Sequence, residues 1–365
     1  MNHHVSILEI NRKALQHNLR FFKQKLAKDT KMLVVVKAFG YGSEATEVAK
    51  HIEKHVDYFA VAYTDEGIAL RKAGIETPIL VLHPQIQNLN IIVSNQLEPN
   101  LYNFNIFDAF LKLADKNLLL NYPIHLKFNT GLNRIGFWHS DVPAILSKAQ
   151  ATNHVKIASV FSHLAASDDV TEDAFTSSQI NDFAFIAKQF KDHLSSQPLF
   201  HILNTSGIVN YPNAQFDMVR LGIGLYGFGN DENETKQLQN VFTLKSIISQ
   251  IHFVEPGESV GYNRAFTANK KMKTATIPIG HADGISRKLG NEKYTVLVKN
   301  QPAEIIGNVC MDMIMIDISN INCTEGEEVI IFNSQEMILK MAEVTETISY
   351  EILTAISQRI KRLLK

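Results

Sequence analysis

The sequence predicts an α/β protein in which an N-terminal (β/α)8 TIM barrel is followed by a mostly-β C-terminal domain. Eight strand-like runs alternate with helix-like stretches over roughly the first 230 residues, which fits a barrel better than the alternative, an open doubly wound sheet. A polar, acidic segment at 230–237 indicates a linker. Beyond it, strand-like runs follow one another with only short turns between them. We therefore expect a barrel in residues 1–232 and a mostly-β domain in residues 233–365.

The first expected element is an amphipathic helix at 11–26, because apolar residues recur at helical spacing from Leu15 to Leu26. The eight barrel strands are expected at 33–37, 58–63, 78–83, 97–102, 124–128, 156–163, 199–204 and 218–226. Helices between them include 43–54, 65–73, 141–149 and 173–193. In the second domain, strands are expected at 242–252, 274–278, 294–298, 313–318 and 328–332.

Composition excludes several classes of partner. The 365 residues include 36 Lys plus Arg and 37 Asp plus Glu, so nucleic acid and anionic membranes gain no electrostatic support. Two cysteines are too few for a disulfide framework or a zinc cluster, and we expect no metal. The N-terminus lacks a signal-peptide core, and no apolar run is long enough to span a membrane. These features predict a cytoplasmic enzyme acting on a small molecule.

The stretch around Lys37 is the strongest chemical signal. Three valines at 34–36 predict a buried strand, and Lys37 follows at its carboxyl end, where β/α proteins place their active sites. An amine in such an apolar mouth loses hydration, which favours its neutral, nucleophilic form. Schiff-base chemistry with a carbonyl is therefore expected, although a lone strand-end lysine is equally often a solvated cap.

A glycine-rich segment follows the eighth strand. Gly222, Gly224 and Gly227 fit the pattern G-x-G-x-x-G, but a dinucleotide site is the weaker interpretation because no helix is expected to start there. Free backbone N–H groups in such a loop suit a phosphate, which barrels often bind after strands seven and eight. The hydroxyl-rich loop at 204–207 is placed to complete that site.

Several of these segments resemble motifs of the alanine racemase family. Residues 34–43, VVVKAFGYGS, resemble its cofactor-lysine signature, with Phe39 and Ser43 departing from the commoner form. The resemblance implies that Lys37 carries pyridoxal 5'-phosphate and that Tyr41 contacts the phosphate. Residues 201–205, HILNT, and 218–223, MVRLGI, resemble two further family motifs. They imply more cofactor-binding residues, namely Asn204, Thr205, Arg220, Gly222 and Ile223.

Arg220 has the largest consequence for reaction type. The resemblance implies that it faces the pyridine nitrogen of the cofactor. An arginine stays protonated and cannot accept the pyridine proton as an aspartate would, so the electron sink is weakened and transamination is limited. From the residues alone, an arginine paired with a carboxylate or a helix end is the commoner interpretation.

The segment 124–136 resembles the family motif K-x-D-T-G-M-x-R-x-G. In that motif the lysine is often carbamylated and orients an arginine that binds the substrate carboxylate. Lys127 and Arg134 take these positions, and Asn129 replaces the usual aspartate. Other matches imply His163 beside the cofactor, Met311 and Asp312 on the substrate side, and Tyr350 near the phosphate and the access channel.

Racemisation needs a base on each face of the α-carbon. Lys37 serves one face, and the resemblance of residues 257–264 to a family segment implies Tyr262 for the other. In the family this tyrosine reaches the lysine of the other subunit, which implies a head-to-tail homodimer with two composite sites. A lone tyrosine after a glycine is ordinarily a core or turn residue, so the assignment rests on the resemblance.

The largest departure is His281, which stands where the family commonly has a tyrosine of the access channel. Histidine is smaller and titrates near neutrality, so we expect an altered channel with unchanged chemistry. The resemblance covers roughly residues 8–362 and implies a racemase that supplies D-alanine for peptidoglycan. Two alternatives are a racemase of serine or another amino acid and a non-catalytic pyridoxal phosphate carrier. The chain also resembles the racemase half of some fusions with a cell-wall ligase.

Overall fold

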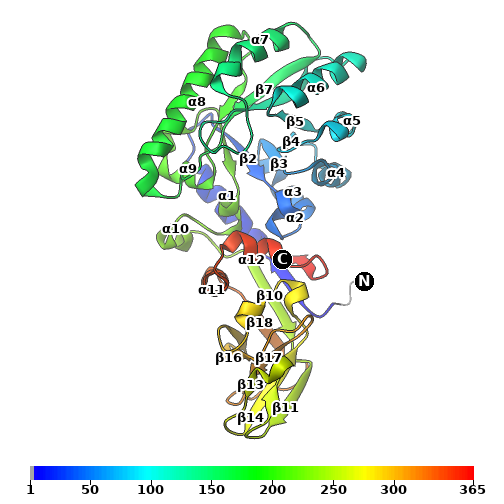
Figure 1. Cartoon of the computed structure of the whole chain (residues 1–365), viewed down its shortest axis with the longest axis vertical. Coiled ribbons are helices and arrows are strands. Elements are labelled where there is room, and N and C mark those ends of the chain that lie inside the picture. Colours follow the sequence, from blue (N-terminus) through cyan, green and yellow to red (C-terminus); the bar gives the residue numbers. More distant parts are fainter. Residues whose placement is uncertain (1–3) are drawn as a thin grey trace.

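The computed structural model describes residues 4–365, which form two parts stacked along the long axis of the molecule (Figure 1). A barrel of strands and surrounding helices occupies one end, and a mostly-β part occupies the other. No helix among residues 4–365 has both the length and the apolar character needed to cross a bilayer.

The barrel confirms the predicted fold class. Its eight parallel strands are β2 (Lys31–Val35), β3 (Tyr58–Val61), β4 (Ile79–Val81), β5 (Glu98–Leu101), β6 (Tyr122–Lys127), β7 (Val155–Phe161), β8 (Leu199–His201) and β9 (Met218–Leu221). Their order is β8-β7-β6-β5-β4-β3-β2-β9. β8 and β9 form no ladder, but the N–H of Asp217 donates to the Phe200 carbonyl and that of Arg220 to the Leu203 carbonyl, each at 3.0 Å. The barrel is therefore nearly closed.

Helices with apolar faces surround these strands. They are α1 (Arg12–Lys23), α3 (Ala45–Ile52), α4 (Thr64–Lys72), α5 (Leu89–Ser94), α6 (Phe104–Lys116), α7 (Val142–Gln150), α8 (Asp173–His193) and α9 (Thr205–Asn210). The segment labelled α2 (Lys37–Tyr41) is a turn with left-handed backbone angles. In α1, the apolar face of Leu15, Leu19 and Phe22 is buried, and Asn11 caps the first turn by accepting the N–H of Ala14.

The mostly-β part is built on one nine-stranded sheet of order β11-β14-β17-β16-β15-β18-β10-β1-β19. Its strands are β1 (Ile7–Ile10), β10 (Phe242–Ile247), β11 (Gln250–Val254), β14 (Met272–Ile277), β15 (Thr295–Val298), β16 (Gln301–Ile306), β17 (Ile314–Asp317), β18 (Glu328–Phe332) and β19 (Lys361–Leu364). A small hairpin, β12 (Ser259–Val260) and β13 (Phe266–Thr267), and helices α11 (Gln335–Thr345) and α12 (Ser349–Ala355) complete it. Although β1 precedes the barrel in the chain, it pairs with β10 and β19 in this sheet.

Three expected elements differ in the structure. The strand expected at 242–252 is two strands, because the chain changes partners when Ile248 N–H bonds to Glu327 and Ser249 N–H bonds to Thr276. The strand expected at 218–226 ends at Leu221, and a 3-10 helix, η6 (Ile223–Tyr226), follows.

The segment expected to be a linker at 230–237 contains a short helix, α10 (Glu232–Gln237). Its acidic residues cap the helix, since Asp231 Oδ1 accepts the N–H of Glu234 and Glu234 Oε2 accepts the N–H of Asn230, both at 2.8 Å. Linkers and helix-capping segments are both rich in polar and acidic residues, so the composition of 230–237 does not reveal the helix.

Asn18 joins the barrel to the chain that leaves it. Its fully buried amide on α1 donates to the carbonyls of Leu225 (3.1 Å) and Gln239 (2.9 Å), and it accepts the N–H of Gln239 (2.8 Å). The substitution Asn18→Ala removes the side-chain partner of three backbone groups, of which the Leu225 carbonyl is buried. We expect it to lower the free energy of unfolding by about 3 kcal/mol, measured by urea denaturation followed by circular dichroism.

The matched control is Asn117→Ala, which removes one exposed bond to the Leu113 carbonyl. This variant should lose less than about 1 kcal/mol. Equal losses in the two variants would contradict the role given to Asn18.

Candidate active site

A cavity of about 410 Å³ opens at the carboxyl ends of the barrel strands. It is lined by Val35, Lys37, Tyr41, Ala62, Tyr63, Leu82, His83, Asn100, Lys127, Arg134, Ile135, Phe161, His163, Asn204, Thr205, Arg220, Gly222, Ile223 and Tyr350. Four of these described residues are cationic, and none is an aspartate or glutamate. The cavity is therefore suited to a ligand with more than one anionic group.

Lys37 begins an unusual turn. Ala38, Phe39, Gly40 and Tyr41 all have left-handed backbone angles, with φ between 52° and 65°. Three of them carry a Cβ, and each such residue costs about 1–2 kcal/mol in this conformation. The neighbouring structure must hold the turn in place. It thereby directs Lys37 and Tyr41 into the same cavity.

Glu66 on α4 is one of the groups that hold this turn. Its Oε1 accepts the N–H of Ala38 at 2.6 Å, and its Oε2 accepts the N–H of Ala62 at 2.7 Å. The half-buried amine of Lys37 loses hydration, which lowers its pKa; the Arg134 cation lowers it further, and the Glu66 charge acts in the opposite direction. The neutral amine is thus favoured more than in an exposed lysine.

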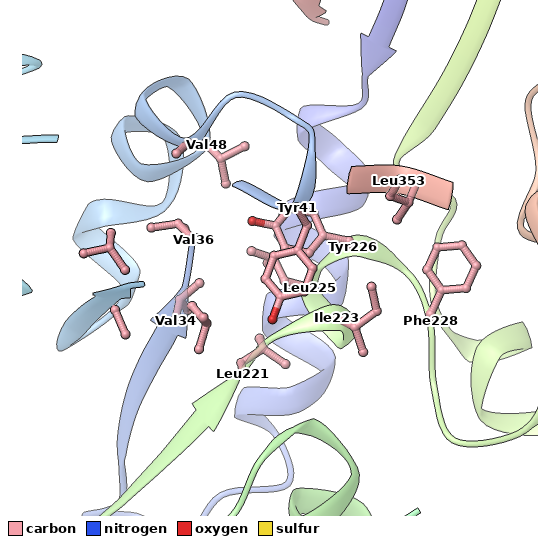
Figure 2. Packing of buried hydrophobic residues seen from close by; sticks show 14 of the residues in the cluster. Val34, Val36, Tyr41, Val48, Leu221, Ile223, Leu225, Tyr226, Phe228 and Leu353 are labelled. Atoms are coloured by element: carbon pink, nitrogen blue, oxygen red, sulfur yellow. The ribbon is translucent and has the colours of Figure 1, made fainter. Parts of the chain in front are cut away.

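The hydroxyls of Tyr41 and Thr205 lie beside Gly222 and form a cradle. The Thr205 hydroxyl accepts the N–H groups of Gly222 at 3.0 Å and Gly224 at 3.4 Å, at the start of η6. A Cβ at Gly222 would lie 2.7 Å from the Tyr41 hydroxyl, so only glycine fits there. Figure 2 shows Tyr41 packed beside Tyr226, with ring centroids 4.8 Å apart. These contacts fix one hydroxyl from α2 and one from α9 beside backbone donors.

The mostly-β part closes one side of this cradle. Leu353 of α12 lies close to the turn in Figure 2, and a Cβ at Gly42 would collide with its carbonyl. Tyr350, also on α12, faces Tyr41 with ring centroids 6.0 Å apart. Burial and the charge of Asp168 raise the pKa of Tyr350 to about 12, so it is a neutral hydrogen-bonding phenol at physiological pH.

Arg220 forms the floor of the cavity. Its guanidinium donates to the carbonyls of Ser162 and Ile202, both at 2.8 Å, and to Nδ1 of His201 (2.8 Å) and of His163 (3.0 Å). Burial lowers the pKa of Arg220 to about 9, which leaves it protonated at neutral pH. Burial and this cation together hold the pKa of His163 well below its ordinary value. His163 is therefore a neutral acceptor.

Lys127 is buried, and Arg134 stands at the rim. The Lys127 ammonium lies 5.1 Å from the centroid of the Phe161 ring, and the structure gives it no carboxylate partner among residues 4–365. Burial and the nearby Arg220 and Arg134 hold its pKa well below the usual value. Asn129 does not contact this pair; its Oδ1 accepts the N–H groups of Gly131 and Asn133 and shapes the turn before Arg134.

Four expected site residues do not line this cavity: Tyr262, His281, Met311 and Asp312. Tyr262 is 71% exposed and lies in the 3-10 helix η7 (Tyr262–Arg264), beside β13 at the end of the molecule remote from the barrel (Figure 1). Met311 is 59% exposed, and Asp312 pairs with Arg359 at 2.7 Å. His281 is exposed at the start of η8 (His281–Asp283).

Two residues that organise the cavity, Glu66 and His201, are not predicted from the sequence. Glu66 lies in the first turn of an expected helix, which is a common place for a carboxylate that binds backbone N–H groups. His201 opens the motif at 201–205, yet nothing in one sequence shows that it faces Arg220 across the gap between β8 and β9.

Comparisons with known proteins all return members of one family. A family model described as "Alanine racemase, N-terminal domain" matches residues 10–229, and one described as "Alanine racemase, C-terminal domain" matches residues 241–364. The alanine racemase of Cutibacterium acnes is 34% identical over 97% of this chain and 96% of its own length. The structure of Clostridium difficile alanine racemase in complex with cycloserine superposes with a TM-score of 0.91, at 32% identity over 99% of this chain and 95% of that one. That of Bartonella henselae alanine racemase, with covalently bound pyridoxal phosphate, gives 0.88 at 26% identity over 99% of each chain.

The environment of Lys37 predicts an unusually reactive amine. In the protein without bound ligand, Lys37 should be acetylated by acetic anhydride near pH 8 faster than the exposed Lys156, because more of it is neutral. Arg134→Gln removes the neighbouring cation, raises the pKa of Lys37 and should slow its labelling about threefold. Competitive labelling followed by peptide mass spectrometry measures both rates. Labelling of Lys37 that is unchanged in Arg134→Gln would contradict this assignment.

Proposed function

The chain belongs to the alanine racemase family and is an isomerase of L- and D-alanine that depends on pyridoxal phosphate; we propose the residue roles that follow. We also propose that its D-alanine supplies peptidoglycan synthesis in the cytoplasm. The observation that carries the proposed mechanism is the cavity that combines Lys37, Arg220 and a hydroxyl-lined cradle. This combination supports a single cofactor held at three points: Lys37, Arg220 and the cradle.

The residues present fit pyridoxal phosphate. A phosphate would suit the cradle formed by the hydroxyls of Tyr41 and Thr205 beside Gly222, with Asn204, Ile223 and Tyr350 around it. Asn204 caps α9 by accepting the N–H of Gly207 at 2.9 Å, and this bond holds the loop that carries Thr205. Lys37 supplies the amine for covalent attachment. His163 and Arg220 line the same cavity.

When bound, pyridoxal phosphate supplies an electron-withdrawing ring that acidifies the α-proton of an attached amino acid. Arg220 can only donate hydrogen bonds, so it would face the ring nitrogen as a donor and would disfavour full protonation of that nitrogen. The four protein acceptors around the Arg220 guanidinium prevent it from turning away. This arrangement favours return of the proton to the α-carbon over transfer elsewhere.

Lys37 and Tyr262 of the partner subunit act as the two bases. Lys37 takes or returns the proton on one face, and its lowered pKa makes this possible near neutrality. Tyr262 is exposed and remote from the cavity of its own chain, which supports a role in a second copy. We infer a head-to-tail homodimer in which residues 233–365 of each chain complete the site in residues 1–232 of the other.

The substrate carboxylate is held by Arg134, with the backbone near Met311 and the Asp312 segment of the partner subunit beside it. Lys127 carries a carbamate in this proposal. A buried amine with a strongly lowered pKa reacts readily with carbon dioxide, and the product would give Arg134 the anionic neighbour that the described cavity residues lack. His281 of the partner subunit borders the access channel.

Mixed dimers test both the reaction and the shared site. Purified protein should racemise L-alanine, and Lys37→Ala and Tyr262→Phe should each lose nearly all turnover. When the two inactive variants are dissociated and reassembled together, half of the dimers contain one site with both bases. About a quarter of the unmodified activity per subunit should therefore return, as measured by D-alanine formation.

No recovery on mixing would contradict the shared site while leaving the racemase activity established by the unmodified protein. Serine is assayed in parallel. Turnover of serine without alanine would favour the alternative racemase, and bound cofactor without turnover of either amino acid would favour the carrier.

His281→Tyr restores the residue common in the family. A phenol is larger than an imidazole, so the variant should narrow the access channel and discriminate more strongly against a substrate larger than alanine. We expect the ratio of kcat/KM for serine to that for alanine to fall about twofold in the variant, with kcat for alanine unchanged. The control is His252→Tyr, at an exposed position on β11. An identical ratio in His281→Tyr and the unmodified protein would show that this idea is wrong.

A further inference from the structure

A row of buried polar side chains crosses the interior of the barrel, one from each of five successive strands. We call it the interior row: Glu98 on β5, His125 on β6, Ser159 on β7, His201 on β8 and Arg220 on β9. All five are buried. Successive members are hydrogen-bonded at 2.6, 2.6, 3.0 and 2.8 Å, from Glu98 Oε2 to Arg220 Nη1.

The position of every proton in the interior row follows from Arg220. A guanidinium can only donate, so Nδ1 of His201 must accept and the ring proton must lie on Nε2. His201 Nε2–H then donates to Ser159 Oγ, and the Ser159 hydroxyl donates to Nδ1 of His125. His125 Nε2–H donates to the Glu98 carboxylate. Every bond points the same way, from Arg220 toward Glu98.

The competing arrangement has a protonated His125 paired with Glu98. Both His125 and His201 would then donate to Ser159 Oγ, and the Ser159 hydroxyl proton would have no acceptor. Among residues 4–365, Ser159 Oγ has no side-chain or backbone partner other than these two rings. Buried polar groups are nearly always paired, so the arrangement with two neutral rings is favoured.

Aromatic packing holds both rings in place. Phe161 stacks on His201 with ring centroids 4.8 Å apart and planes at 4°, and Tyr58 meets His125 edge-on at 5.8 Å. Burial and the Arg220 cation lower the pKa of His201 well below its ordinary value. These contacts and the burial of both rings oppose a ring flip, which favours a single hydrogen-bond direction along the row.

We propose that Glu98, His125 and Ser159 are positioning residues that lock His201 as an acceptor and thereby fix Arg220 toward the cofactor ring. If the His201 proton moved to Nδ1, two donors would face each other and the guanidinium would turn. The proposal rests on the role given above to Arg220. It adds that control of reaction specificity begins deep in the barrel, four strands away from Arg220, at Glu98.

The first test uses the protein without bound cofactor. In cofactor-free protein labelled with 15N-histidine, NMR should show His201 and His125 neutral with the proton on Nε2, and the signals are assigned by their loss in His201→Asn and His125→Asn. Ser159→Ala should shift the His201 signals, whereas Ser159→Thr, which keeps the hydroxyl, should largely preserve them. A protonated His125, or a His201 proton on Nδ1, would overturn the proposal whatever the enzyme's activity.

The second test uses the holoenzyme. Ser159→Ala should lower kcat for alanine racemisation about tenfold with little change in KM, and it should raise pyruvate release by transamination relative to racemisation. The control is Ser246→Ala, which removes an equally buried serine on β10 that does not line the cavity and whose hydroxyl bonds to that of Ser6. Parallel losses in both variants without a change in the racemisation-to-transamination ratio would refute the positioning role.

Discussion

A buried guanidinium needs hydrogen-bond acceptors, and in this protein that need shapes the centre of the barrel. Arg220 finds acceptors in the carbonyls of Ser162 and Ile202 and in the nitrogens of His163 and His201. These partners lie at or just beyond the ends of β7 and β8, so the arginine on β9 bridges the gap where the barrel has no ladder. Removing charge from water is costly, and these hydrogen bonds offset part of that cost. The same hydrogen bonds that stabilise the Arg220 guanidinium also fix its orientation in the cavity.

The cavity also depends on a part of the chain that lies outside the barrel. The left-handed turn at 38–41 is packed against Leu353 of α12, and Arg362 donates to the carbonyl of Gly42 at 3.1 Å. Glu66 holds the other side of the turn through the N–H of Ala38. A strained segment with partners on both sides has one geometry, so Lys37 and Tyr41 enter the cavity in a fixed relation.

Much of the fold can be predicted from the sequence, because strand-like and helix-like runs alternate along the barrel and the change to closely spaced strands marks the second part. The strand at 7–10 is not predictable in the same way: it has four residues, and its partners lie more than two hundred residues away. The left-handed turn is also hidden, since only one of the four residues at 38–41 is a glycine. Lys37 can be singled out by its place after a strand, whereas Tyr262 and Arg134 are found only by resemblance. His125 and Ser159 meet through strand register, which one sequence does not reveal.

The place of β1 has a consequence for how this protein is made. β1 precedes the barrel strands in the chain but lies between β10 and β19, so it acquires its first neighbour only when residues 242–247 have been synthesised. At ordinary rates of translation that interval is about 10–50 seconds. During it, the nascent barrel carries an apolar strand with two open edges, which is the kind of segment that chaperones bind. The order of synthesis and the order of assembly are therefore different in this chain, because β1 is covered first on the edge facing β10 and later on the edge facing β19.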